Sequence, residues 1–242
     1  MGSGRDGWAG LMGYEKIRRL VRQLRGELGL DEALSEMGPN HATEFADALE
    51  IEGFPKPKGG HFPLWESIGR FREALTDFLA GKDHAFIGGV AVRSYGAREA
   101  PTKDYDVMVD SRHLKEITSF LEGQGAALKG TVEDTYQFRV EHLKFDFDVR
   151  VATSPLDREA LAAAKGATFS GRKLRIVQSD HLAAMKVKAY SERKGSVKGQ
   201  LDASDVRGLI GVGATTEDAV RGALKKHRPD LLAELDEILA SE

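Results

Sequence analysis

The 242-residue sequence contains no cysteine. This absence excludes disulfide bonds, thiolate nucleophiles and cysteine-ligated zinc or iron–sulfur centres. The chain also lacks any apolar run near the roughly 18 residues that a membrane-spanning helix needs. Its first residues, MGSGRDGWAGLMGYEK, do not contain the apolar centre of a secretory signal peptide. We therefore expect a cytoplasmic protein that does not enter a membrane.

An excess of charge of one sign is also missing, since the formal net charge of the chain is -3. A chain so nearly balanced has no global attraction to nucleic acid or to an anionic membrane surface. One segment, MKVKAYSERKGSVK from Met185, is locally basic. Such a run is more often a solvated helix face than a surface that binds RNA.

Apolar periodicity divides the chain into three parts. Residues 1–62 carry helix patterns and end in a loop rich in glycine and proline, GFPKPKGGHFP. Residues 63–178 mix strand and helix patterns, and residues 179–242 carry helix patterns only. This order predicts an α/β (α+β) core, in which a mixed sheet is flanked by helices, with helical parts at both ends.

The expected elements follow from the spacing of apolar residues. We predict strands at His84–Ile87, Asp104–Val109, Ala126–Lys129 and Lys173–Val177, and an antiparallel hairpin whose two runs begin at Tyr136 and Lys144. The predicted helices of the core and the C-terminal part are Leu64–Ala80, Val90–Tyr95, Arg112–Glu122, Pro155–Ala164, Asp180–Lys194, Asp202–Ile210, Thr216–His227 and Pro229–Ala240.

Four aspartates alternate with apolar residues in two of these strands. Asp104 and Asp106 flank Tyr105, and the run FDFDVRV contains Asp146 and Asp148 in the same arrangement. Alternate residues of a strand face one side of the sheet, and adjacent carboxylates repel unless a cation lies between them. Oxygen ligands without sulfur favour magnesium or manganese over zinc. If the two strands are neighbours they predict a divalent-metal site; otherwise each is the exposed face of a half-buried strand.

A glycine pair, Gly88 and Gly89, separates an apolar strand pattern from a helix pattern. Glycine lets the backbone come close to a ligand, and the N-terminus of a helix presents unpaired N–H groups to a phosphate. The pair is equally compatible with a tight turn that binds nothing. Neither the P-loop pattern GxxxxGK[ST] nor the dinucleotide fingerprint GxGxxG occurs in the chain.

Taken in order, the apolar strand, the glycine pair, the short helix, the DYD strand and the later acidic strand resemble the nucleotidyltransferase fold of the DNA polymerase β superfamily. GGVAVRSYGAREAPTKDYDVMV is similar to the start of the AbiEii-type branch of toxin–antitoxin and abortive-infection systems. FDVRVATSPLDREAL is similar to the strand that carries its third carboxylate, and SDHLAAMKVKAYSERK with DASDVRGLI to its closing helices. The resemblance spans Phe86–Ile210, and one stretch, Gly96–Thr102, is a residue longer than is usual.

This resemblance implies a set of site residues. The implied nucleotide-binding residues are Gly88, Gly89, Arg98, Thr102 and Lys186. The implied catalytic and metal-binding residues are Asp104, Asp106 and Asp148. Asp146 competes with Asp148 for the third position. Asp205 falls on a later acid of the branch, where it is as well suited to pair with a lysine as to act.

The resemblance also implies an activity: a Mg²⁺- or Mn²⁺-dependent transfer of a nucleoside monophosphate from a nucleoside triphosphate to an acceptor hydroxyl. RNA (including tRNA), a protein and a small molecule are all candidate acceptors, and the chain would be the toxin of a toxin–antitoxin pair with an antitoxin as its partner. The alternatives are a non-catalytic nucleotide-binding or partner-binding protein on the same fold, or a purely structural protein. The histidines His84, His113, His142 and His181 lack metal-ligand spacing and are expected to be structural or exposed.

Overall fold

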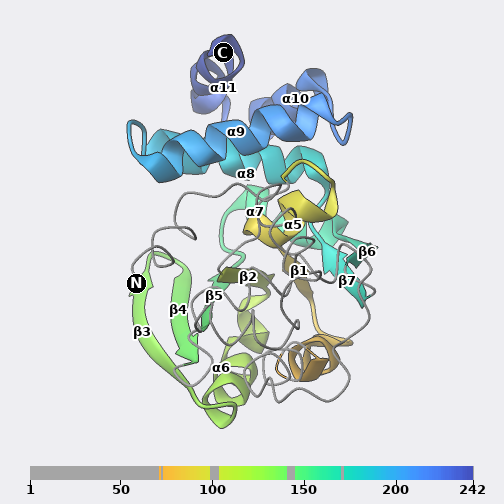
Figure 1. Cartoon of the computed structure of the whole chain (residues 1–242), viewed down its shortest axis with the longest axis vertical. Coiled ribbons are helices and arrows are strands. Elements are labelled where there is room, and N and C mark those ends of the chain that lie inside the picture. Colours follow the sequence, from red (N-terminus) through yellow and green to blue (C-terminus); the bar gives the residue numbers. More distant parts are fainter. Residues whose placement is uncertain (1–70, 72, 99–103, 141–144, 170–171, 242) are drawn as a thin grey trace, which may run out of the picture.

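The structure is a computed structural model that describes residues 71, 73–98, 104–140, 145–169 and 172–241. A seven-stranded sheet with the order β3-β4-β5-β2-β1-β7-β6 runs through its core (Figure 1). The strands are β1 (His84–Phe86), β2 (Asp104–Val109), β3 (Ala126–Val132), β4 (Thr135–Val140), β5 (Phe145–Val151), β6 (Lys165–Phe169) and β7 (Arg172–Ile176). The predicted N-terminal helical part, residues 1–62, lies outside the described residues.

The sheet is mixed, as the sequence predicts. Strands β2 and β5 pair in parallel, as do β1 and β7, and the remaining neighbours pair antiparallel. The predicted hairpin is confirmed as β4 and β5. One strand, β6, was not predicted, because the sequence KGATF contains a glycine and no clear alternation. It pairs with β7 and forms one edge of the sheet.

Helices flank the sheet and also make up the C-terminal part of the chain. They are α5 (Gly88–Ser94), α6 (Leu114–Gly123), α7 (Pro155–Ala163), α8 (Ser179–Glu192), α9 (Val197–Gly211), α10 (Glu217–His227) and α11 (Leu232–Ala240), with 3-10 turns η1 (Ser111–His113) and η3 (Pro229–Leu231). Residues 73–79 are also helical. Helix α9 begins at Val197, five residues before its predicted start at Asp202, and the hydroxyl of its N-cap Ser196 accepts a hydrogen bond from the Gly199 N–H. No helix in the described ranges is long and apolar enough to cross a bilayer.

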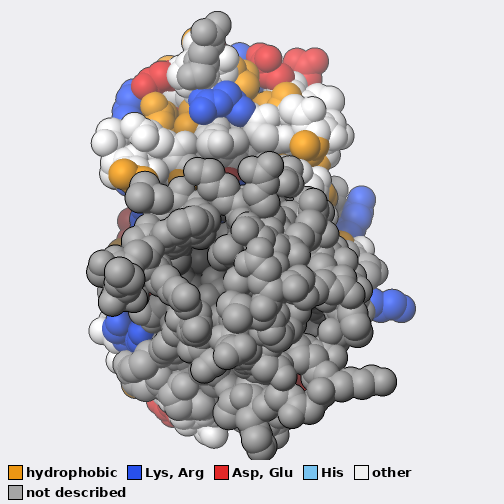
Figure 2. Space-filling view, viewed as in Figure 1, with side chains coloured by type: hydrophobic (Ala, Val, Ile, Leu, Met, Phe, Trp, Pro, Cys, Tyr) orange, Lys and Arg blue, Asp and Glu red, His pale blue; other side chains and the backbone are white. Residues whose placement is uncertain are grey.

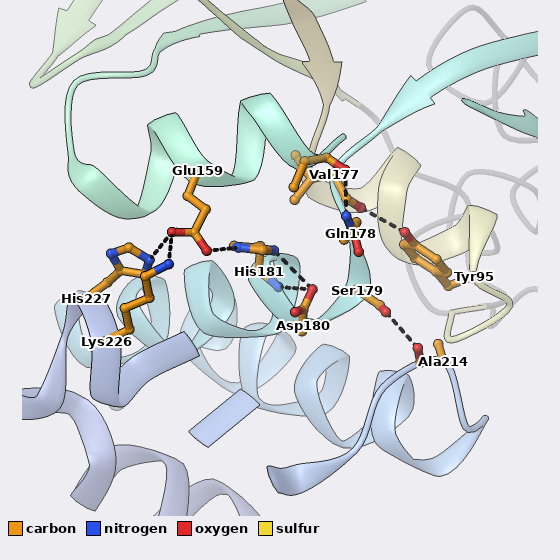
Figure 3. Close-up of polar contacts among 11 residues, drawn as sticks. Tyr95, Glu159, Val177, Gln178, Ser179, Asp180, His181, Ala214, Lys226 and His227 are labelled. Atoms are coloured by element: carbon orange, nitrogen blue, oxygen red, sulfur yellow. Dashed lines mark hydrogen bonds and ion pairs between the residues drawn. The ribbon is translucent and has the colours of Figure 1, made fainter. Parts of the chain in front are cut away.

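The C-terminal helices form a separate layer beyond one end of the sheet, and α8 lies between that layer and the core (Figure 1). The connection from β7 to α8 is held by hydrogen bonds on both sides. The Tyr95 hydroxyl donates to the Val177 carbonyl at 2.9 Å, and the Ser179 hydroxyl donates to the Ala214 carbonyl at 2.6 Å (Figure 3). These bonds attach α8 to the end of α5 on one side and to the end of α9 on the other.

Alternation in the two central strands sorts apolar residues from acidic ones. In β2, Tyr105 and Val107 are buried, and in β5 so are Phe147 and Val149. Because successive residues point to opposite faces of a strand, this buried set leaves Asp106 and the acidic residues of β5 on the other face. The apolar face packs into the core that fixes the position of both strands.

Candidate active site

The central feature of the site is the parallel pairing of β2 with β5. This pairing aligns Asp106 with Asp148 and Asp104 with Asp146. Paired residues on neighbouring strands lie about 4.8 Å apart, and Asp106 and Asp148 share a face of the sheet. The two acidic strands that the sequence shows separately are therefore adjacent and in register.

The glycine turn packs directly against this carboxylate pair. Gly88 begins α5 with φ +60°, and a Cβ added to it would lie 1.8 Å from Oδ2 of Asp106. The Ile87 N–H also donates to the Asp106 carbonyl oxygen at 3.0 Å. Only glycine fits a position with positive φ and a carboxylate against its Cα. Gly88 and Asp106 thus form a single structural unit, and Gly89 follows as a buried residue of the first turn of α5.

We predict that Gly88→Ala greatly reduces the function of this site. The added methyl group must displace the Asp106 carboxylate, and the left-handed backbone adds strain of about 1–2 kcal/mol. Activity is expected to fall by roughly a hundredfold, which is the effect of displacing reacting groups by about 1 Å. Gly81→Ala is the matched control, because Gly81 has φ +77° but nothing within 4 Å of an added Cβ. A Gly88→Ala protein as active as Gly81→Ala would contradict the prediction.

The two candidates for the third carboxylate differ in their neighbours. Asp146 accepts hydrogen bonds from Nη1 of Arg139, on β4, at 2.8 and 3.0 Å, and its side chain is 47% exposed. Asp148 is instead the register partner of Asp106 and lies opposite Gln137 of β4. That Asp148 is the third carboxylate stays a prediction, and Asp146 forms an ion pair with Arg139.

The chemistry of these side chains fits a hard divalent cation. Carboxylate oxygens on adjacent strands are the ligands that Mg²⁺ and Mn²⁺ prefer. No group of three or more His, Asp or Glu residues within the described part of the chain is already arranged around a metal position. The side chain of Asp104 is outside that part, so Asp104 is placed only by its backbone, at the start of β2. Thr102 lies outside the described residues altogether.

Lys186 lies in a buried charge network. Its Nζ is 2.8 Å from Oδ1 of Asp202 and 2.9 Å from Oδ2 of Asp205, and all three side chains are at most 12% exposed. Burial alone would lower the pKa of Lys186, but the carboxylates of Asp205 and Asp202 outweigh it and raise the pKa above its ordinary value. The network continues outward to two arginines. Arg193 donates a hydrogen bond to Asp202 at 2.7 Å, and Arg98 donates to Asp205.

The structure therefore brings the sequence-predicted site residues into two groups. One contains Gly88, Gly89, Asp106 and Asp148, and the other contains Arg98, Lys186 and Asp205. Asp202 was missed by the sequence interpretation. The signal was its spacing of three residues from Asp205, which places both carboxylates on one face of α9.

A second polar cluster joins α7 to the C-terminal helices (Figure 3). Glu159 of α7 accepts from Lys226 and His227, the latter at 2.9 Å, and lies 3.4 Å from Nε2 of His181. Nδ1 of His181 lies 3.0 Å from Oδ1 of Asp180. The hydrogen bond from Lys226 is the main reason why the pKa of Glu159 falls to about 2. The hydrogen bond with Asp180 is the main reason why the pKa of His181 rises above 6.5.

These shifts predict how stability depends on pH. Because the pKa of His181 is raised in the folded protein, its contribution is fully present below about pH 6.5 and is lost as the pH rises through the folded pKa. Burial lowers the pKa of His84, so the contribution of His84 to stability is present above about pH 6.5 and is lost as the pH falls through the folded pKa. We expect the free energy of unfolding, measured with urea, to fall above pH 6.5, and to fall less in His181→Gln. An equal fall in both proteins would contradict this assignment.

No protein-family model and no curated protein matches the sequence. A solved structure nevertheless shares the fold. The antibiotic-resistance factor ANT(2'')-Ia superposes with a TM-score of 0.51 over 71% of this chain and 96% of its own, at 13% identity. The chain has a nucleotidyltransferase fold.

Two further structures superpose less closely on this nucleotidyltransferase fold. A nucleotidyltransferase-like protein from Paracoccidioides brasiliensis is 20% identical, with 71% of this chain and 93% of its own covered, at a TM-score of 0.43. The lincosamide antibiotic adenylyltransferase LnuA is 11% identical, with 61% of this chain and 96% of its own covered, at a TM-score of 0.44. The AbiEii-type branch stays a prediction.

Proposed function

We propose that the chain is a cytoplasmic, metal-dependent nucleotidyltransferase, which moves a nucleoside monophosphate from a nucleoside triphosphate to an acceptor hydroxyl. The observation that carries this proposal is the unit formed by Gly88, Asp106 and Asp148. It combines a glycine turn at a helix start with two carboxylates in register on adjacent parallel strands. Within a nucleotidyltransferase fold, such a unit supplies both a phosphate contact and a cation site.

Each residue then has a role in the proposed reaction. Asp104, Asp106 and Asp148 would hold Mg²⁺ or Mn²⁺, and a divalent ion supplies charge neutralisation at phosphoryl oxygens and acidifies a bound hydroxyl. The backbone of Gly88 and Gly89 would contact the triphosphate.

In the transfer step, a bond forms between the acceptor oxygen and the α-phosphorus while the bond from that phosphorus to the bridging oxygen breaks. Pyrophosphate leaves, and the proton of the acceptor hydroxyl passes to Asp148, the carboxylate farther from the glycine turn. Thr102 and Lys186 would assist by contacting the triphosphate. Lys186 would make this contact in addition to its ion pairs with Asp202 and Asp205.

The charge pattern of the C-terminal helices bears on the choice among the candidate acceptors. Lys188 pairs with Glu192 at 2.6 Å, and Lys194 pairs with Glu237, so the basic segment predicted from the sequence is partly neutralised. Acidic and basic side chains also lie together over these helices in Figure 2. RNA therefore gains no support from charge, and a small molecule or a protein hydroxyl is at least as well suited. ANT(2'')-Ia, which is described as an antibiotic-resistance factor, is consistent with a small-molecule acceptor.

A second candidate is a nucleotide-binding protein without transfer, which would use the same glycine turn and carboxylates. A binding protein would be stabilised by nucleotide with Mg²⁺, by about 2.7 kcal/mol at a hundredfold excess over the dissociation constant, yet would transfer nothing. The first proposal includes a toxin with an antitoxin partner. Such a toxin would modify an acceptor that the cell needs.

The test is transfer of label from each α-phosphate-labelled nucleoside triphosphate in Mg²⁺ or Mn²⁺. Total RNA, total protein, a panel of antibiotics with free hydroxyls, and buffer alone are offered separately as acceptors. We expect label in one pool, and none after the metal is removed with a chelator. Nucleotide-dependent thermal stabilisation without label in any pool would instead support the binding protein.

A further inference from the structure

We infer that Arg98 is a positioning residue, which braces the chain entering β2 against α9 through Asp205. This inference rests on the proposed function, because the entry to β2 carries the proposed metal-binding aspartates. It assigns to Arg98 a role other than the nucleotide contact that the sequence resemblance implies.

The ion pair between Arg98 and Asp205 is buried and bidentate. Nε of Arg98 donates to Oδ1 of Asp205 at 2.8 Å, and Nη2 donates to Oδ2. The arginine side chain is 13% exposed and the aspartate 2%. A planar fork of this kind fixes orientation as well as distance.

A second contact, independent of charge, holds the neighbouring residue to the same helix face. Gly208 lies three residues after Asp205, on the same side of α9. A Cβ added at Gly208 would lie 2.6 Å from the carbonyl oxygen of Ala97. One face of α9 therefore holds two consecutive residues of the chain, Ala97 by close packing and Arg98 by an ion pair.

The other side of this segment is fixed by α5. The Ala97 N–H donates to the Val92 carbonyl at 3.2 Å, after a turn in which Gly96 has φ +74°. Residues 96–98 are thus held between α5 and α9, and only residues 99–103 separate Arg98 from Asp104, where β2 begins. Arg98 is therefore close in sequence to the carboxylate strand.

Asp205 itself is fixed by Lys186 of α8, at 2.9 Å. The brace therefore runs from the β2 entry through α9 to α8, which packs on the core. Arg98 acts through Asp205 and not through the nucleotide, and this difference can be measured.

The test compares Gly208→Ala and Arg98→Lys with the control Gly211→Ala. Gly211 also lies in α9, but an added Cβ there has nothing within 4 Å. Arg98→Lys keeps the charge and removes the bidentate fork, so it serves if Gly208→Ala does not fold. Amide hydrogen exchange at residues 97, 98 and 104–106 is measured first, followed by kcat and nucleotide KM for transfer.

We expect faster exchange at residues 97, 98 and 104–106 in both test variants, with kcat lower by roughly ten- to hundredfold and nucleotide KM nearly unchanged. Gly211→Ala should match the wild-type protein in all three measurements. Unchanged exchange in both test variants would overturn the brace, whatever the activity. A rise in nucleotide KM with kcat unchanged in Arg98→Lys would also overturn it, in favour of a nucleotide contact. A wild-type protein that transfers nothing would count against the proposed function, and exchange alone would then decide the inference.

Discussion

Asp106→Asn and Asp148→Asn are each expected to lower kcat for nucleotidyl transfer by about three orders of magnitude. Asparagine keeps the size of the side chain but removes the negative charge that a divalent ion requires. The charge stabilisation supplied at such a site is worth several kcal/mol, and about 4 kcal/mol corresponds to a thousandfold in rate. The measurement is the initial rate of label transfer at saturating nucleotide and Mg²⁺.

Two other aspartates serve as comparisons. Asp77 is exposed on the helix at residues 73–79, so Asp77→Asn should retain full activity. Asp146→Asn should lose less than Asp148→Asn, because Asp148 is the register partner of Asp106. A larger loss in Asp146→Asn than in Asp148→Asn would show that the third position had been assigned to the wrong residue.

Lys186→Met is expected to lower the free energy of unfolding by about 3–5 kcal/mol. Methionine preserves the length of the side chain but leaves Asp202 and Asp205 without their shared cation, and both carboxylates are at most 3% exposed. Removing one partner of a buried ion pair costs about 3–5 kcal/mol because the remaining charges stay buried, and the arginines that still contact Asp202 and Asp205 place Lys186→Met at the lower end of this range. Urea unfolding followed by circular dichroism gives the value.

Lys188→Met is the matched control for that measurement. Lys188 lies two residues along α8, and its partners Glu192 and Glu133 are 50% and 72% exposed. An exposed ion pair contributes about 0–1 kcal/mol, so the control should lose no more than that. Equal losses in the two variants would mean that the network around Lys186 does not stabilise the fold.

The carboxylate strands were predictable because acidic and apolar residues alternate in their sequences, which is the period of two typical of a strand. The run from Asp104 to Val109 alternates, and the structure contains a strand over that same range. Which carboxylates become neighbours was not predictable, since it depends on the register of β2 with β5. A shift of that pairing by two residues would have placed Asp146 beside Asp106 with no change in either local pattern.

The charge network was less accessible from the sequence. Lys186 and Asp205 were identified through the resemblance, but each pattern describes a single helix, and their contact depends on how α8 packs on α9. Strand β6 was missed for a related reason. Its apolar pattern is weak, and pairing with β7 defines it more than local preference does.

The brace at Arg98 also bears on the order in which the chain is made. Its partner Asp205 lies 107 residues further along the sequence, whereas both acidic strands are complete at residue 151. Domains fold as they are synthesised from the N-terminus, so a growing chain has its carboxylate strands long before α9 exists. The contacts of Ala97 and Arg98 with α9 form only when that helix has left the ribosome. Nucleotidyl transfer would then begin only after synthesis is essentially complete, and a product truncated before α9 would be inactive.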